Sequence, residues 1–251
     1  MWWMLPFLFA GVFLVHFCKM LRLYLVLMEH KIGFGKFIRL YFRTTFVNLI
    51  IPFKIGELYR FYSISSVTKL WQVGILSVFL DRFFDIVALV LVLLPFDLIV
   101  HGRLTMVTFI LLVGIIVLAV VYLCIMPSCH YLNHYIIRNK TSKRAMVALK
   151  GLDVIKEWYD FTKNLITGRF ALIILASLAG WIVEVGVLKL FALYLSIPFG
   201  VGDFSEYIRA IFTGETNMLL RSYTLFGAVF MLAATVISYL VYFVRSKSGD
   251  A

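Results

Sequence analysis

The sequence has few charged residues and few cysteines for its length. Only 15% of its 251 residues are charged and three are cysteines, whereas about one quarter of an average soluble domain is charged. Hydrophobic residues make up 63% of the chain and the mean hydropathy is +0.97, which excludes the soluble classes of protein. The three scattered cysteines are too few for a disulfide framework and do not indicate a compartment.

Acidic residues are also scarce, since 13 Asp and Glu oppose 24 Lys and Arg and leave a formal net charge of +11. Such an excess suits nucleic acid, an anionic membrane face or an anionic substrate. The apolar bulk of the chain favours the last two, and we expect no nucleic-acid partner. The excess lies in residues 1–60, with eight basic and two acidic residues, and in residues 128–169, with eight and three.

Five stretches are long and apolar enough to cross a bilayer, which takes roughly 20 mostly apolar residues. Two of them contain no charge, Leu104–Met126 and Leu225–Val244. Three others carry ionisable residues inside them, Trp2–Met28, Gln72–Phe96 and Phe170–Leu195. The sequence therefore predicts an all-α polytopic membrane protein with about five full transmembrane helices.

Two shorter segments are ambiguous. Thr44–Phe53 is apolar but only about ten residues long. Pro52 ends the apolar run and charged residues follow it, so a re-entrant or interfacial segment is favoured over a full crossing. Asp203–Leu220 is the second such segment. The chain shows no internal repeat, heptad array or low-complexity linker, so we expect residues 1–251 to form a single transmembrane domain. The apolar amino terminus lacks the basic region and cleavage site of a signal peptide, and we expect it to be retained.

The basic residues beside the spans predict the orientation. Ser128–Arg169 and Glu29–Arg43 are basic and are both expected on the cytoplasmic side, as is the carboxyl terminus. Five spans then place the amino terminus outside the cell membrane, provided that Thr44–Phe53 returns to the side from which it came. Within Ser128–Arg169 the apolar spacing predicts an interfacial helical segment, with Trp158 and Phe161 available at the level of the headgroups.

Three ionisable residues lie together inside the second span. Asp81, Arg82 and Asp85 are three and four positions apart, so a helix brings their side chains to adjacent faces. An ionisable group at membrane depth costs at least about 2.5 kcal/mol and usually has a partner. Two carboxylates and one guanidinium leave one negative charge over, so either one Asp is protonated or a second cation comes from elsewhere. The group is either a functional site or a structural ion-pair network.

A bent segment upstream offers such cations. Pro52 prevents the preceding residue from continuing a helix, and Gly56 permits a close approach or a break. Lys54, Glu57 and Arg60 lie on this segment, and a helix starting after Gly56 would place the last two on one face. Irregular backbone at membrane depth is tolerated where it lines a cavity, which is typical of a transporter site. The alternative is an interfacial loop whose charged side chains extend to water.

Charged residues in two other spans can complete the lining of such a site. Arg22 and Lys19 lie in the first span and Glu184 lies near the middle of the fourth. Lys19 and Lys189 are close to span ends, so we expect them to extend to the interface. For Glu184 a role in binding neighbouring helices together and a role in the site both stay open.

Catalytic and metal-binding patterns are weak in this chain. His130 and His134 are four apart, but without an intervening Glu this spacing is poor evidence for a metal. Neither a nucleophile elbow nor a dinucleotide fingerprint is present. We therefore expect no catalytic residue, no metal and no cofactor.

The charged segments together resemble a known family. Arg22 in the first span is followed by Asn48–Arg60, which reads NLIIPFKIGELYR, and by Leu80–Asp85, which reads LDRFFD. This order resembles the lysylphosphatidylglycerol synthase transmembrane region family of flippase-like integral membrane proteins, over roughly residues 15–95. The family also has a late Pro/Gly-rich stretch with a Glu, of which Phe212–Thr216 retains only Gly214 and Glu215.

The resemblance implies a membrane domain that moves or handles anionic and glycosylated lipids, among them aminoacylated phosphatidylglycerol and lipids of polyprenyl-linked sugar pathways. The soluble aminoacyl-transfer domain of the synthases is not found here, so synthase activity is not implied. The expected partner is thus an anionic membrane lipid or a polyprenyl-phosphate-type lipid, with a membrane enzyme as a further partner. The substrate-binding candidates are Lys54, Glu57, Arg60, Asp81, Arg82, Asp85, Arg22 and Glu184.

Our main hypothesis is therefore a protein that binds such a lipid and helps it cross the cytoplasmic membrane. Lys54, Arg60 and Arg82 would contact phosphate, and the carboxylates would hold these cations when the site is empty. The first alternative is a non-transporting membrane partner of a glycosyltransferase or lipid-modifying enzyme. The second is a membrane transferase, against which stands the lack of a donor-binding domain.

Overall fold

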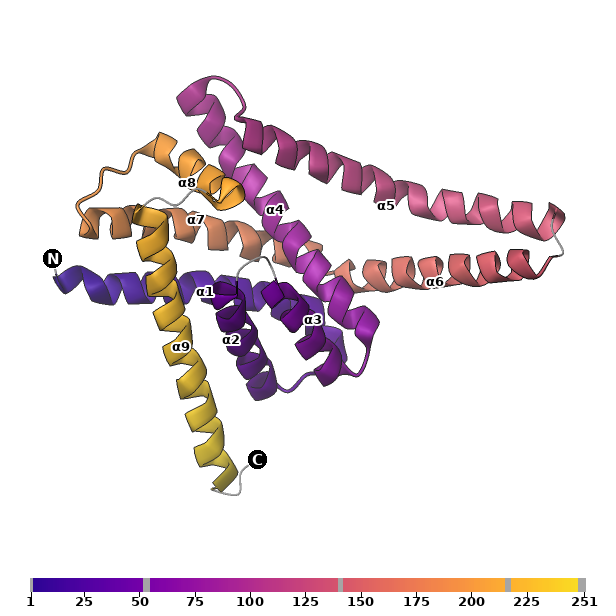
Figure 1. Ribbon diagram of the computed structural model, residues 1–251, viewed down its shortest axis with the longest axis horizontal. Helices are drawn as coiled ribbons and strands as arrows, with labels where there is room; N and C mark the ends of the chain where they lie inside the picture. The colour runs from indigo at the N-terminus through magenta and orange to yellow at the C-terminus, as the bar shows by residue number, and fades with distance from the viewer. Residues whose placement is uncertain (1, 52–54, 140–141, 215–217, 248–251) are drawn as a thin grey trace.

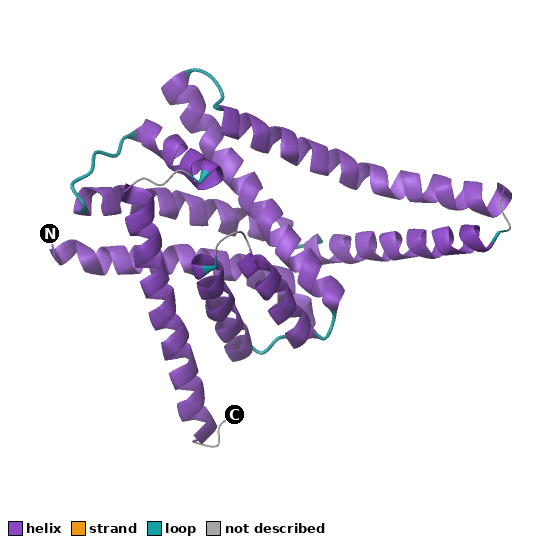
Figure 2. Ribbon diagram, viewed as in Figure 1, coloured by secondary structure: helices purple, strands orange, loops and turns teal. Residues whose placement is uncertain are grey.

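The chain is helical throughout the part that the computed structural model describes, residues 2–51, 55–139, 142–214 and 218–247. Within these residues there are nine α-helices and two short 3-10 turns, and no strand (Figures 1 and 2). The turns are η1 (Trp2–Met4) and η2 (Met28–His30), and the helices are α1 (Leu5–Leu27), α2 (Phe34–Ile50), α3 (Ile55–Thr68), α4 (Trp71–His101), α5 (Met106–Asn139), α6 (Lys143–Ile166), α7 (Phe170–Tyr194), α8 (Val201–Thr213) and α9 (Met218–Lys247).

Five of these helices are long and apolar enough to cross a membrane, namely α1, α4, α5, α7 and α9. Each overlaps one of the five stretches expected from hydropathy over most of its length, so the prediction of a polytopic α-helical membrane protein is confirmed. The largest difference in bounds is at α5, which continues through Pro127 to Asn139. At about 1.5 Å per residue this helix is longer than a bilayer core is thick, so part of it extends beyond the membrane.

Helices α2 and α3 form an antiparallel hairpin, and the described part of the segment Thr44–Phe53, residues 44–51, contains the end of α2. Near its tip the Asn48 amide donates to Glu57 Oε1 at 3.0 Å, and further back Arg43 Nη2 lies 3.5 Å from Ser63 Oγ. The two helices have only 17 and 14 residues, too few for a full span. The chain therefore returns to the end of the bundle from which α2 starts, as the re-entrant interpretation requires.

Glycine allows the close approach at the tip of this hairpin. A Cβ atom added to Gly56 would lie 2.4 Å from the Asn48 Cα and 2.6 Å from its side-chain oxygen. A backbone atom cannot move aside cheaply, so any larger residue at this position would push α3 away from α2. Of the two roles open to Gly56, close approach is thus the one that the structure supports.

The centre of the molecule is the pair α1 and α7, which run antiparallel beside each other and are crossed by α4 (Figure 1). Val12 and Val15 of α1 pack with Val187 and Phe191 of α7 in one apolar cluster. On the other side of α7, Trp181 and Leu188 pack against α4. Apolar residues of α1, α4 and α7 therefore pack against one another at the centre of the bundle.

The ambiguous segment Asp203–Leu220 is not a span. Its described residues belong to most of the short helix α8, whose buried residues Phe204, Tyr207 and Ile208 pack on α4 and α7, and to the first turn of α9. Helix α9 then runs along α2, where Met231 joins the core cluster of the hairpin. The carboxyl-terminal span therefore covers the hairpin.

The basic segment 128–169 comprises the end of α5 and helix α6, which together extend away from the bundle (Figure 1). The rings of Tyr122 on α5 and Tyr159 on α6 stack with centroids 4.8 Å apart. At the bundle end of α6, Trp158 lies against Trp71 and Phe161 lies against His30. Their expected position at the headgroup level stays a prediction.

The spans have two distinct ends. At one end, called the basic end, the η2 turn meets the link between α6 and α7: Arg169 Nη1 donates to the Leu25 carbonyl oxygen at 3.0 Å and its guanidinium pairs with Glu29. At the opposite end lie the link 102–105 and helix α8, joined through the buried carboxylate of Asp97. Which end faces the cytoplasm stays a prediction.

Candidate functional site

Arg22 is the centre of the charged residues in the membrane-spanning helices. From α1 its Nε donates to Asp81 Oδ1 at 2.6 Å, and its Nη1 donates to Asp85 Oδ1 at 2.5 Å. The Nη1 group also lies 3.4 Å from Ser177 Oγ on α7. The side chain is 3% exposed, so this guanidinium binds both carboxylates of α4 within the helix bundle.

Arg60 provides a second cation for the same carboxylate. Its Nη1 lies 2.9 Å from Asp81 Oδ2, and both side chains are buried. Asp81 is therefore held between one guanidinium from α1 and one from α3. The sequence left open whether one Asp is protonated or a further cation neutralises the surplus negative charge. The structure provides further cations, Arg22 from α1 and Arg60 from α3.

Arg82 connects the re-entrant hairpin to α4. Its guanidinium forms an ion pair with Glu57, which also accepts the hydrogen bond from Asn48, and its Nη1 lies 3.8 Å from Asp85 Oδ2. The Arg82 side chain is 42% exposed, far more than the other two arginines. Arg82, the most exposed of these three arginines, therefore attaches the hairpin to α4 through Glu57.

The charges of this network balance, since three guanidiniums face three carboxylates. Hydrogen-bonding capacity nevertheless remains, because Arg60 Nε, Arg82 Nε and Glu57 Oε2 are buried and have no partner within the described part of the chain. A buried ion-pair network of this kind is worth little net stability, but removing one member leaves an unpaired charge. Its geometric effect is to fix α1, α3 and α4 relative to one another.

Lys19 and Glu184 form a second ion pair beside the network. Lys19 Nζ lies 2.6 Å from Glu184 Oε2, joining α1 to α7, so the expectation that Lys19 extends to the interface was wrong. The ammonium also lies 5.6 Å from the centre of the Trp181 ring, and Trp181 Nε1 donates to the Asp85 carbonyl oxygen at 3.1 Å. The physical reason is that α7 offers a carboxylate within reach, whereas extension to water would leave Glu184 buried and unpaired.

This second ion pair lines a cavity of about 630 Å³ between α1, the tip of α2, α7, α8 and the start of α9. That volume lies within the range of about 300–1,000 Å³ that is usual for small-ligand pockets. Much of the wall is apolar, including Val12 and Leu49. Its polar side chains are those of His16, Lys19, Glu184, Tyr207, Arg221, Tyr223 and Thr224.

The predicted site residues therefore divide into two places. Six of them meet in the ion-pair network, namely Arg22, Glu57, Arg60, Asp81, Arg82 and Asp85. Glu184 lines the cavity, as does Gly214 from the late family stretch. Lys54 and Glu215 lie outside the described residues. Arg60 pairs with Asp81 and Arg82 pairs with Glu57 and Asp85, but neither arginine lines this cavity.

Sequence reasoning missed most of the polar residues of the cavity wall. One sequence feature could have indicated the cavity wall: Lys19 lies one helical turn before Arg22 and hence on the same face of α1. His16 lies one turn earlier still on that face. Tyr207, Arg221 and Tyr223 come from α8 and α9, and nothing in their spacing points to α1.

A metal site finds no support in the part of the chain that is described, where no group of three or more His, Cys, Asp or Glu side chains converges. His130 lines a small pocket of about 50 Å³ at the α5–α6 hairpin together with Cys129 and Asp153. Its volume is far below that of the cavity, and its residues are remote from the charged network in sequence.

A comparison with protein families gives a match to the family described as the lysylphosphatidylglycerol synthase TM region, over residues 1–214. The chain belongs to this family. The match extends well beyond residues 15–95, where the charged motifs lie, and reaches the end of α8. No curated protein and no solved structure gave a match. As a member of the lysylphosphatidylglycerol synthase TM region family, this protein is an integral membrane protein.

Proposed function

We propose that this protein binds the headgroup of an anionic, glycosylated or aminoacylated lipid in the cavity between α1, α7, α8 and α9 and carries it across the cytoplasmic membrane. The observation that carries the proposal is the Lys19–Glu184 ion pair on the wall of a largely apolar cavity within membrane-spanning helices. Ionisable groups at this depth mark substrate pathways more often than they serve packing alone.

The chemistry of the wall suits a phosphate-bearing headgroup. A phosphate that enters the cavity can accept hydrogen bonds from Lys19 and Arg221, and the hydroxyl groups of Tyr207 and Tyr223 can bind its neighbouring oxygens. Glu184, released from Lys19, is then available for an ammonium group or a sugar hydroxyl. Apolar residues such as Val12 line the remaining wall, where the first methylene groups of the lipid would lie.

The ion-pair network has a different role in this proposal. It holds α3 against α1 and α4, and through Glu57 and Asn48 it anchors the tip of the hairpin, beside which Leu49 lines the cavity. A shift of the hairpin would break the more exposed Arg82–Glu57 pair before the buried Arg60–Asp81 pair. Discontinuous helices beside a central site are typical of transporters that open alternately to the two sides.

The expected substrate is an anionic membrane lipid or a polyprenyl-phosphate-type lipid, and the basic end is expected to face the cytoplasm. That orientation follows from the excess of Lys and Arg beside the spans. The basic surface would also attract anionic headgroups from the inner leaflet to this end of the protein.

The test is headgroup translocation in proteoliposomes with fluorescent phosphatidylglycerol and with its aminoacylated form. Lys19→Met and Glu184→Gln should each slow translocation about tenfold or more, since each removes a charge-assisted contact. Lys189→Met is the matched control, because Lys189 lies on the same helix as Glu184 and is exposed. This control should leave the rate unchanged.

Three outcomes would contradict the proposal. Wild-type rates in both cavity variants, with the protein still folded, would remove the cavity from the mechanism. Loss of a co-purifying glycosyltransferase or lipid-modifying enzyme, without change in lipid movement, would favour the alternative of a non-transporting membrane partner. Product formation by the purified protein alone would instead support a membrane transferase.

A further inference from the structure

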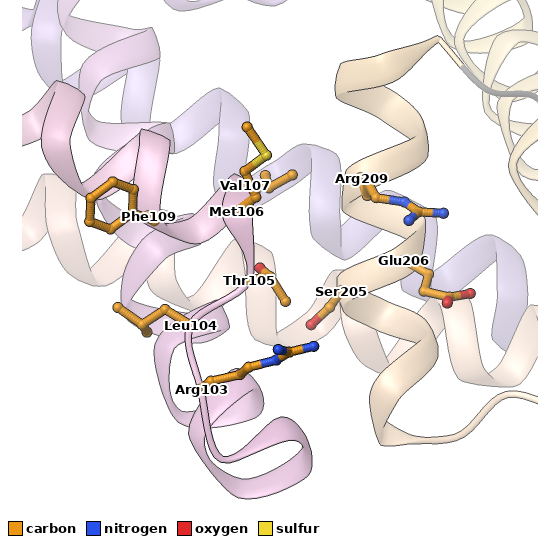
Figure 3. Close-up of a pocket in the computed structure, with 9 residues that line it drawn as sticks. All are labelled: Arg103, Leu104, Thr105, Met106, Val107, Phe109, Ser205, Glu206 and Arg209. Carbon is orange, nitrogen blue, oxygen red and sulfur yellow. The ribbon is translucent and has the colours of Figure 1, made fainter.

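A second pocket lies at the end of the bundle opposite to the basic end. It has a volume of about 560 Å³ and is formed by the link between α4 and α5, the first turns of α5, and α8 (Figure 3). It shares no lining residue with the cavity of the proposed function. Its position at the ends of two spans is where the polar headgroups of a leaflet lie.

The buried carboxylate of Asp97 binds two residues that line this pocket, Thr105 and Ser205. Ser205 Oγ donates to Asp97 Oδ1 at 2.9 Å, and the backbone nitrogen and hydroxyl of Thr105 donate to Oδ2 at 2.9 and 2.8 Å. Asp97 is fully buried, and these neutral donors join the link to α8. The two walls of the pocket are thus fixed relative to each other before any ligand enters.

The charged side chains of the pocket have a positive sum. Arg103 and Arg209 line it together with the single carboxylate of Glu206. Arg103 is exposed and forms no ion pair with any residue that the structure describes, and in Figure 3 its guanidinium extends toward α8 near Ser205. A guanidinium in this position can bind phosphate oxygens with two parallel hydrogen bonds.

The pocket has polar side chains on both sides, with Arg103 and Thr105 on the link and Ser205, Glu206 and Arg209 on α8, whereas its apolar side chains lie only on the link and the start of α5. Figure 3 shows Ser205, Glu206 and Arg209 on α8, with Leu104 and Phe109 on the opposite side. This apolar face continues along α5, where Met106, Phe109, Ile110 and Val113 are exposed. A free phosphate ion would use only the polar side chains, whereas a phospholipid would use the polar side chains and the apolar face.

We propose that this pocket binds the phosphate headgroup of an anionic phospholipid, with the acyl chains lying along the exposed face of α5. The site is separate from the translocation cavity and does not depend on the proposed function. Arg103 is the main phosphate ligand, Arg209 adds positive charge, and Glu206 opposes it. Basic pockets between transmembrane helices are a recurrent way of holding a phospholipid headgroup.

The test uses the full-length protein in phosphatidylcholine vesicles that contain a small fraction of phosphatidylglycerol with a photoactivatable acyl chain. Cross-links should concentrate on Met106–Val113, as located by mass spectrometry of the peptides. Arg103→Gln should reduce them about tenfold, because a charge-assisted hydrogen bond to phosphate is lost. Glu206→Gln should raise them, because a repelling charge is removed.

Arg138→Gln is the matched control, since it makes the same change at the other end of α5 on an exposed residue. It should leave the cross-links at Met106–Val113 unchanged, and so should Lys19→Met, which affects only the proposed translocation cavity. Unlabelled phosphatidylglycerol should compete, whereas glycerol phosphate without acyl chains should not. Equal cross-linking in Arg103→Gln and wild type would overturn the proposal, and competition by glycerol phosphate would show a site for a free anion instead.

Discussion

Arg22 on α1 and Asp81 on α4 are joined by a hydrogen bond of 2.6 Å between Nε and Oδ1, although 59 residues separate them in the chain. Both side chains are almost completely buried, at 3% and 1% exposure. A charge in this environment is tolerated only because an opposite charge and directed hydrogen bonds accompany it. Packing of α1 against α4 therefore depends on these two residues being ionised together.

Removal of the Asp81 charge should destabilise the protein strongly. Asp81→Asn leaves Arg60 without its ion pair and Arg22 with Asp85 alone, and breaking a buried pair typically costs about 3–5 kcal/mol. We expect a clear fall in the thermal unfolding midpoint of the detergent-solubilised protein. Asp153→Asn makes the same change at an exposed position of α6 and should leave the midpoint unchanged. An unchanged midpoint for Asp81→Asn would mean that the network contributes nothing to the fold.

Close packing at the hairpin tip should make Gly56 sensitive to the smallest substitution. Gly56→Ala places a methyl group 2.4 Å from the Asn48 Cα, and relief of such overpacking typically costs about 1–3 kcal/mol. Thermal unfolding should show this loss. Gly114→Ala is the control, since nothing lies within 4 Å of a Cβ at that position. Equal midpoints for the two variants would contradict the close approach of α2 and α3.

The re-entrant path predicts which positions a membrane-impermeant thiol reagent can reach. In a cysteine-free background, Lys36→Cys and Lys69→Cys flank the hairpin and should be labelled from the same side of the membrane. Arg103→Cys should be labelled only from the other side. All three positions are exposed. Labelling of positions 36 and 69 from opposite sides would show that the segment Thr44–Phe53 crosses the membrane.

Much of the fold could be predicted because lipid imposes a simple rule on the sequence. A spanning helix must satisfy its own backbone and expose apolar side chains, so its position is visible as a long hydrophobic stretch. The same rule showed that Thr44–Phe53 is too short to span a bilayer. It also showed that the charged residues within Gln72–Phe96 are costly and need partners. The close approach at Gly56 was one of two open alternatives, since glycine allows both a contact and a break.

The candidate site was predicted less completely. Asp81 and Asp85 share a helical face, so their common partner could be expected, but the choice of Arg22 depends on how α1 crosses α4. Lys19 was assigned to the interface because the sequence does not show that Glu184 of α7 lies opposite to it. Local spacing describes one helix, whereas these pairs join two.

The sequence by itself determined the class of protein, the number of spans, the shortness of the apolar segment Thr44–Phe53 and the presence of costly charges within the helices, because each follows from hydrophobicity and periodicity along one segment. Only the tertiary structure decided which charges neutralise one another and which of them line a cavity. Arg60 and Arg82 became members of a closed network, while Lys19 and Glu184 came to line the cavity. The physical reason is that ion pairing acts over a few ångströms in space, and that distance is set by helix packing rather than by position in the chain.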